Sequence, residues 1–212
     1  DEDSEIMLFA RNRHGFSEPL ATRVRGVARP QSGKGPRHEQ PRLFVLAVGV
    51  SEYESEVPRL AFAAKDAGDL AARLRSQHGR LYREVEVRSL TDGQVTRGKL
   101  IEGLKWLERS VTASDVAILF FAGHGVSDGR GGYYYLAADT NRKNHRETGL
   151  SFVDIRNVLA RLKGRTLFMV DTCYSGDVLG RKGLDVTYVA NDLSSPENGI
   201  VVMAASTGRQ LS

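Results

Sequence analysis

Between residues 42 and 212, short apolar runs alternate with segments whose apolar residues recur at helical spacing. The runs with strand composition cover residues 43–50, 84–90, 115–121, 165–170 and 199–205. The segments with helical spacing cover residues 61–77, 96–110 and 151–162, and residues 133–137 add a hairpin signal. Such alternation predicts an α/β fold, in which helices cover both faces of a mostly parallel sheet.

Residues 1–28 follow a different pattern. Residues 5–12 and 21–27 have strand composition and flank a Gly-containing turn, which predicts a β-hairpin. The pattern of Ala, Asn, Gly, Ser and Pro across residues 10–19 resembles the last two strands of a fibronectin type III or related immunoglobulin-like sandwich.

The domain organisation follows from these patterns. Residues 29–41 are rich in Pro, Gly and polar side chains and predict a linker. The linker separates the end of a β-sandwich-like domain, residues 1–28, from one α/β domain, residues 42–212. Because the chain begins with Asp1 rather than Met, we expect it to be a fragment of a longer protein.

Composition narrows the functional classes. The net charge is +4 with a pI near 9.3, but no run of five basic residues occurs, so nucleic-acid binding is not indicated. No apolar stretch reaches the roughly 18 residues of a membrane helix, and the acidic N-terminus is unlike a signal peptide. A single cysteine excludes an internal disulfide framework and a multi-cysteine zinc site. We expect a cytoplasmic protein with no bound metal or cofactor.

Two candidate catalytic side chains follow two of the predicted strands. His124 stands between glycines just after the apolar run 116–121, and Cys173, the only cysteine, comes shortly after residues 165–170. Because sites in parallel sheets lie at the carboxyl ends of the strands, we expect both residues at one edge. There His124 can act as the base for a Cys173 nucleophile, and backbone N–H groups near Gly125 and Cys173 can form an oxyanion hole.

Other interpretations of the two residues are less specific. A lone cysteine is often a small buried apolar residue, but the charged Asp171 and a Gly-containing turn flank this one. A histidine at a strand end can serve only as a cap, but flanking glycines give His124 few neighbours and allow close approach by a substrate. A tyrosine phosphatase loop would need arginine where Leu179 stands, a thioredoxin-like site would need a second cysteine, and no dinucleotide-binding fingerprint is present.

The segments Phe-Phe-Ala-Gly-His-Gly at residues 120–125 and Asp-Thr-Cys-Tyr-Ser-Gly at residues 171–176, in this order, resemble the caspase-like (clan CD) cysteine peptidases. The resemblance extends over about residues 42–212 and is strongest to the metacaspase and bacterial orthocaspase branch. It implies a three-layer α/β/α sandwich. It also implies that the chain ends near the close of the large-subunit-like half, so that a C-terminal part or another chain completes the substrate cleft.

The same resemblance assigns roles to individual residues. His124 and Cys173 correspond to the catalytic pair, and Asp171 and Asp66 to acidic residues of the primary specificity pocket. Two carboxylates would select a cationic side chain by charge-assisted hydrogen bonds, although Asp66 is also an ordinary acid for the first turn of a helix. Gly180 replaces a calcium ligand that metacaspases often carry, so a calcium requirement is doubtful.

The resemblance therefore implies a cysteine endopeptidase that cleaves protein or peptide substrates after Arg or Lys. It would be part of a larger, multidomain bacterial protein and would carry out regulated proteolysis in stress, defence or cell death. Two alternatives stay open: a catalytically silent caspase-like scaffold, and a different thiol hydrolase. Residues 177–198 have the composition of a long loop that contains Arg181 and Lys182, and Arg209 lies near the chain's end. We expect activation by self-cleavage at these basic residues or by an activating partner or effector.

Overall fold

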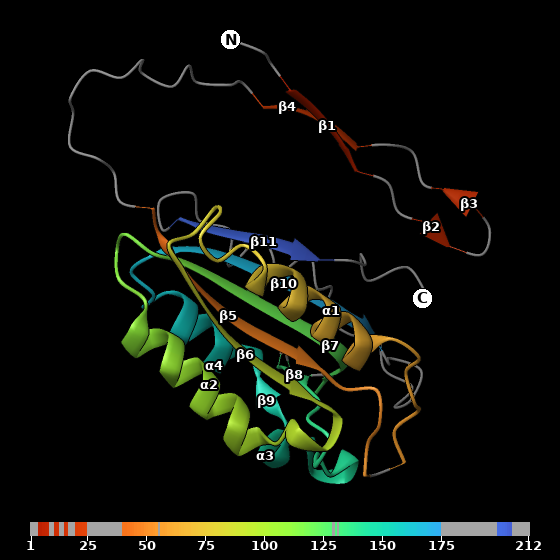
Figure 1. Cartoon of the computed structure of the whole chain (residues 1–212). Coiled ribbons are helices and arrows are strands. Elements are labelled where there is room, and N and C mark those ends of the chain that lie inside the picture. Colours follow the sequence, from red (N-terminus) through yellow and green to blue (C-terminus); the bar gives the residue numbers. More distant parts are fainter. Residues whose placement is uncertain are drawn as a thin grey trace, which may run out of the picture. The chain divides into compact units, whose positions relative to one another are not determined.

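The computed structural model describes residues 4–8, 11–12, 15–16, 20–24, 40–54, 56–128, 130, 132–174 and 199–204 (Figure 1). For Cys173 and Tyr174 the description is of the backbone. The chain divides into two compact units, which comprise residues 1–39 and residues 40–211.

The N-terminal unit contains the predicted hairpin. Strand β1 (Ser4–Leu8) pairs antiparallel with β4 (Leu20–Val24), and β2 (Arg11–Asn12) pairs antiparallel with β3 (Gly15–Phe16). The first predicted strand is thus divided in two. The assignment of this hairpin to a fibronectin III-like sandwich stays a prediction.

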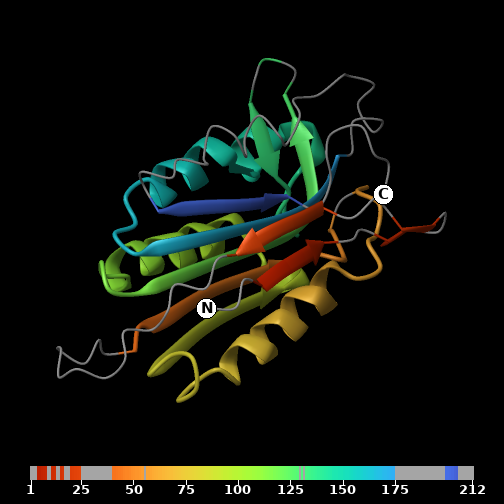
Figure 2. The same cartoon turned by 90° about the horizontal axis from the view of Figure 1, so that it is seen from above.

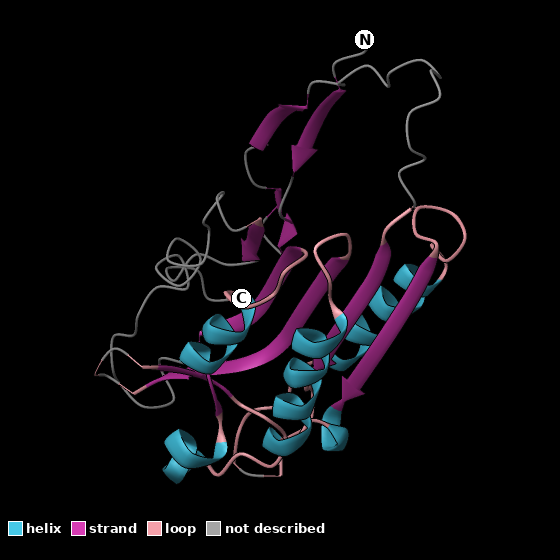
Figure 3. Cartoon of the chain, turned by 90° about the vertical axis from the view of Figure 1, so that its left-hand side faces the viewer, coloured by secondary structure: helices cyan, strands magenta, loops and turns pink. Residues whose placement is uncertain are grey.

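Residues 40–211 contain a seven-stranded sheet (Figure 3). Five of its strands follow the order β11-β10-β7-β5-β6, labelled in Figure 1, and each adjacent pair in this order is parallel. The strands are β5 Arg42–Gly49, β6 Glu84–Thr91, β7 Val116–Ser127, β10 Arg165–Tyr174 and β11 Ile200–Ala204. Two short strands, β8 Tyr133–Tyr135 and β9 Leu150–Ser151, add antiparallel pairs beyond β7. The mostly parallel sheet predicted from the sequence is confirmed.

Helices cover the sheet on both faces (Figure 2). Helix α1 (Ala63–Arg75) packs its alanines on one face, whereas α2 (Arg97–Ser110) and α4 (Phe152–Leu159) pack on the other. Side chains alternate along β5, so Leu43, Val45 and Ala47 join the α1 layer while Phe44, Leu46 and Val48 join the other layer. The shorter elements are η1 Asp92–Gln94, η2 Arg142–Asn144 and α3 His145–Thr148. The three-layer α/β/α sandwich is confirmed.

Side-chain caps determine where two helices begin. The hydroxyl of Thr96 accepts the N–H of Lys99 at α2, and that of Ser151 accepts the N–H of Val153 at α4. Each cap satisfies an N–H that has no partner within its helix. Ser151 thus marks the start of the helix predicted over residues 151–162.

Strands β7 and β10 are longer than their apolar runs predict. Strand β7 continues through His124 to Ser127, because β8 pairs with residues 125–127. Strand β10 likewise continues through Cys173 to Tyr174 alongside β7. Both candidate catalytic residues thus lie within strands near their carboxyl ends, not in loops after them.

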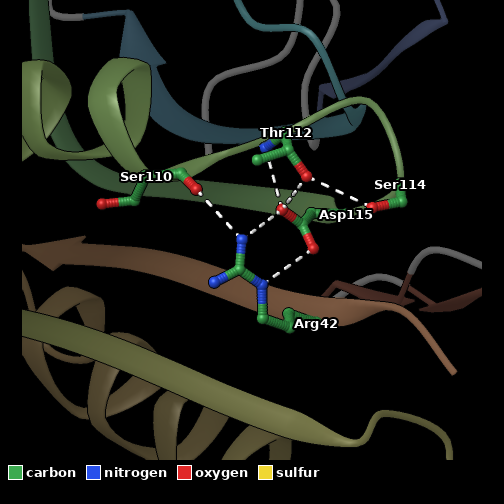
Figure 4. A network of polar contacts seen from close by, with 5 residues as sticks. All are labelled: Arg42, Ser110, Thr112, Ser114 and Asp115. Carbon is green, nitrogen blue, oxygen red and sulfur yellow. Dashed lines mark hydrogen bonds and ion pairs between the residues drawn. The ribbon is translucent and has the colours of Figure 1, made fainter. Parts of the chain in front are cut away.

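Arg42 and Asp115 form an ion pair at the end of the sheet where β5 begins, away from the candidate catalytic residues (Figure 4). Arg42 donates from Nε and Nη2 to the two carboxylate oxygens of Asp115, at 3.0 and 2.8 Å. The N–H and hydroxyl of Thr112 donate to Asp115 Oδ2, and Arg42 also reaches the carbonyl of Ser110. These donors hold the pKa of the Asp115 carboxyl far below its usual range, although burial alone would raise it. The pair connects the start of β5 with the turn that leads from α2 into β7.

Candidate active site

The two candidate catalytic residues are neighbours across two parallel strands. In the register of β10 and β7, Cys173 stands beside His124 and Asp171 stands beside Ala122. Leu167 and Met169 of β10 pack in the α1 layer, and Ala122 of β7 does the same. Strand alternation therefore assigns positions 124 and 171 to the α1 side of the sheet.

The His124 side chain is held from the loop between β5 and α1. It is only 6% exposed, and its Nε2 lies 2.8 Å from the backbone carbonyl oxygen of Pro58. The backbone N–H of His124 donates to the Tyr53 hydroxyl at 2.8 Å, and the two rings lie 5.4 Å apart. Two contacts from one loop thus determine where the imidazole lies.

These contacts also determine the tautomer of the neutral ring. A carbonyl oxygen can only accept, so Nε2 of His124 carries the hydrogen that is donated to Pro58. Nδ1 then carries the lone pair, and no described residue bonds to it. Burial lowers the pKa of the His124 imidazole, and the Pro58 carbonyl opposes this change. The ring is therefore neutral at pH 7, with Nδ1 able to accept a proton.

The glycines beside His124 make room for tyrosines. A Cβ atom on Gly125 would lie 1.9 Å from the Tyr133 hydroxyl oxygen, and one on Gly123 would lie 3.0 Å from the hydroxyls of both Tyr53 and Tyr135. The expectation that His124 has few side-chain neighbours is therefore wrong, whereas close approach of a substrate to these glycines stays a prediction. Sequence neighbours gave no sign of the packing because the tyrosines come from other segments.

The strand that carries Cys173 is fixed on its other face. The hydroxyls of Thr172 and Tyr133 lie 3.1 Å apart in a buried hydrogen bond, and the Tyr133 ring packs edge-on against Phe152. Thr172 thereby anchors β10 between Asp171 and Cys173. The Gly125 backbone lies beside Tyr174 in the register. The oxyanion-hole role of Gly125 and Cys173 stays a prediction.

The two predicted pocket acids lie within electrostatic reach of each other. Asp66 is in the first turn of α1, and Asp171 is on β10. The Asp171 side chain is open to solvent on one side, yet partial burial raises the pKa of its carboxyl, and the charge of Asp66 raises it further. The two carboxylates thus repel one another, and their role in a specificity pocket stays a prediction.

Several predicted features fall outside the described residues. They are Gly180, Arg181, Lys182, Arg209 and the loop 177–198. In the described part of the chain, no group of three or more His, Cys, Asp or Glu side chains could hold a metal ion. No helix in that part is long and apolar enough to cross a bilayer.

Comparison with known proteins identifies the family of the chain. The family model of the caspase domain, peptidase C14, matches residues 42–212. The chain belongs to the caspase-domain family. No match was found among curated proteins. Residues 42–212 are thus a caspase domain, and its assignment to the metacaspase branch stays a prediction.

The caspase domain is also similar to a solved structure. A crystallised protein from Geobacter sulfurreducens superposes with a TM-score of 0.53 at 21% sequence identity. The match covers 66% of this chain and 53% of the other, so this chain spans about half the length of that protein. At this identity the likeness concerns the fold alone.

Sequence reasoning overlooked the groups that hold His124. Tyr53 lies between the strand predicted at residues 43–50 and the helix predicted at residues 61–77, where the sequence has no catalytic pattern. The Pro58 carbonyl is a backbone group, so residue identity carried no signal for it. Only the path of the loop brings both groups to His124.

Proposed function

We propose that the caspase domain is a cysteine endopeptidase that cleaves peptide bonds after Arg or Lys, with Cys173 as nucleophile and His124 as base. The observation that carries this proposal is the His124 imidazole, which donates Nε2–H to Pro58 and whose Nδ1 has no hydrogen-bond partner among the described side chains, on the strand next to that of Cys173. A neutral imidazole with a fixed acceptor nitrogen is what activation of a thiol requires.

The reaction would follow from this geometry. Nδ1 of His124 takes the thiol proton of Cys173, and the thiolate attacks the carbonyl carbon of the scissile bond. The C–N bond breaks as His124 returns the proton to the leaving amine, which leaves a thioester on Cys173. A water molecule then gives a proton to Nδ1, attacks the thioester and releases the acid, and the proton returns to sulfur.

Specificity for a basic side chain is supported by Asp171 and Asp66. A bound guanidinium or ammonium group would relieve the repulsion that raises the pKa of Asp171. We further propose that the domain works within a larger cytoplasmic protein. In that protein, a C-terminal part or another chain completes the substrate cleft, and a partner or effector controls the activity.

The deciding experiment compares the full protein with its Cys173→Ala and Cys173→Ser variants on fluorogenic peptides that end in Arg, Lys or Asp. We expect cleavage after Arg and Lys by the parent protein alone. An inert parent protein in the presence of its natural partners would favour the silent scaffold. Turnover retained in Cys173→Ala would indicate a different catalytic group.

A further inference from the structure

The loop between β5 and α1, residues 50–62, contributes two groups to His124. These are the Tyr53 hydroxyl, which accepts the backbone N–H, and the Pro58 carbonyl, which accepts Nε2–H. A loop lacks the continuous hydrogen bonding of a strand or helix, so its conformation depends on specific tethers. Whatever fixes this loop also fixes the imidazole.

Asp92 provides the tether at the start of the loop. Its Oδ1 accepts the backbone N–H groups of Ser51 at 2.8 Å and Glu52 at 3.0 Å. Ser51 in turn accepts the N–H of Ala64 on its hydroxyl and the N–H of Leu60 on its carbonyl, both at 3.0 Å. Both ends of the loop therefore meet at Ser51, and Asp92 holds Ser51.

The backbone of Asp92 adopts an unfavourable conformation to do this. Its φ angle of +46° is in the left-handed region, and among the described residues no other non-glycine residue has a positive φ. Thr91 of β6 and Gly49 of β5 are the last register partners of these two strands, and Asp92 follows where the strands diverge. The turn directs the carboxylate back to the adjacent loop. Strain of this kind persists where the surrounding structure requires it.

We propose that Asp92 is a positioning residue, whose carboxylate holds the loop that carries Tyr53 and Pro58 and so keeps His124 in the orientation and tautomer that leave Nδ1 as base. Asp92 acts through the loop and not on the reacting atoms. Its catalytic meaning rests on the proposed function, whereas its effect on the His124 ring does not.

Three substitutions of Asp92 and one control, made in the full protein, distinguish the effect of losing the Asp92 carboxylate from the effect of relieving its backbone strain. Asp92→Gly removes the acceptor and relieves the left-handed backbone, so any loss arises from the missing hydrogen bonds. Asp92→Asn keeps an Oδ1 acceptor, and asparagine tolerates the left-handed region. Asp92→Ser keeps a shorter acceptor and provides a second test if the glycine variant fails to fold. The matched control is Asp128→Gly, because Asp128 Oδ1 also accepts two backbone N–H groups, from Arg130 and Gly132.

The first readout is the imidazole tautomer of His124, measured by ¹⁵N NMR at pH 8 and assigned with His124→Gln among the five histidines. We expect a single Nε2–H tautomer in the parent protein, in Asp92→Asn and in Asp128→Gly. In Asp92→Gly we expect a mixture of tautomers, and in Asp92→Ser an intermediate ratio. The thermal unfolding midpoint of each variant is measured alongside, so that only folded protein is compared.

The second readout is cleavage of an Arg-terminated peptide. Misplacement of the base should lower kcat in Asp92→Gly by about tenfold or more with little change in KM, and Asp92→Asn should stay near the parent. Parent-like tautomer and kcat in folded Asp92→Gly would overturn the proposal, as would an Asp92→Asn variant as impaired as the glycine variant. If the parent cleaves no basic peptide but Asp92→Gly still loses the tautomer, the proposed function fails while the positioning role stands.

Discussion

His124 and Pro58 are joined by a hydrogen bond of 2.8 Å from the imidazole Nε2 to the backbone carbonyl oxygen. The contact assigns the hydrogen of the neutral ring to Nε2 and leaves Nδ1 for proton transfer. Because a backbone carbonyl supplies it, no side-chain substitution at residue 58 removes it directly. Its consequences are best tested through His124 itself.

The pH dependence of activity should reflect the burial of His124. Burial lowers the pKa of this imidazole below its usual value, so the base stays neutral to lower pH. We expect the acidic limb of kcat/KM for a basic peptide to lie below about pH 6.5, the value of an exposed histidine. A pH–rate profile on the Asp171→Asn background, from which the nearby carboxylate has been removed, isolates this limb. A limb above pH 7 on that background would contradict the assignment.

The lowered pKa of His124 should also make the folded chain less stable as the pH falls. The folded-state pKa is lower than the unfolded one, so below the unfolded value of about 6.5 protonation favours the unfolded chain. His124→Gln should therefore weaken the loss of stability between pH 7 and pH 5. Denaturant titrations at both pH values measure the difference. An unchanged pH dependence would show that His124 titrates as it does in the unfolded chain.

Asp171→Asn should separate activity from stability. The raised pKa of Asp171 means that its ionised form is unfavourable in the folded chain, so a neutral isostere should leave the unfolding midpoint equal or higher. Cleavage after Arg should nevertheless fall by about a hundredfold, because a cationic group loses its partner. Asp66→Asn should act in the same direction, and Asp69→Asn on the same helix is the control. A parent enzyme that prefers Asp-terminated peptides would rule out the acidic pocket.

The Arg42–Asp115 pair should be important for folding. Asp115 is 1% exposed, so its replacement by Asn leaves Arg42 without its buried counter-charge. Because Arg42 is itself 25% exposed, solvent offsets part of this loss, and we expect a cost below the about 3–5 kcal/mol of fully buried pairs. Because the folded pKa of Asp115 is lowered, its contribution is present above about pH 4 and is lost as pH falls below that value. Denaturant unfolding of Asp115→Asn, with Glu108→Gln at the solvent-exposed Arg161 pair as control, tests this. Equal effects of the two substitutions would contradict it.

Calcium should not be required, because Gly180 stands where related enzymes often have an acidic ligand. Activity of the full protein in excess EGTA should match activity with added calcium. Loss of activity in EGTA that calcium restores and magnesium does not would refute this prediction.

Control of activity should act through residues 177–198 and the chain's end. Arg181, Lys182 and Arg209 are the basic residues that a pocket lined by Asp171 and Asp66 would accept from its own chain. Mass spectrometry of the activated protein, compared with its Cys173→Ala form, should detect cleavage after one of them. An active protein with an intact chain would exclude obligatory self-cleavage and support ordering of the loop by a partner or effector.

The sequence by itself determined the class of fold and the two central residues. Apolar periodicity placed the strands and helices, because burial of one face of each element constrains every second or every third to fourth residue. The positions of His124 and Cys173 after two apolar runs then predicted that they would meet at the carboxyl edge of a parallel sheet, and the register places them side by side. Strand ends were less predictable, since β7 is extended by pairing with β8.

Only the tertiary structure decided how His124 is held. Tyr53 and Pro58 are 71 and 66 positions away in the chain, and Asp92 reaches their loop from a third segment. None of these contacts has a periodic signature, because hydrogen bonds in loops depend on the path of the backbone rather than on which side chains alternate. The glycines beside His124 illustrate the same limit. Their sequence context indicated open space, whereas folding fills that space with Tyr133, Tyr135 and Tyr53.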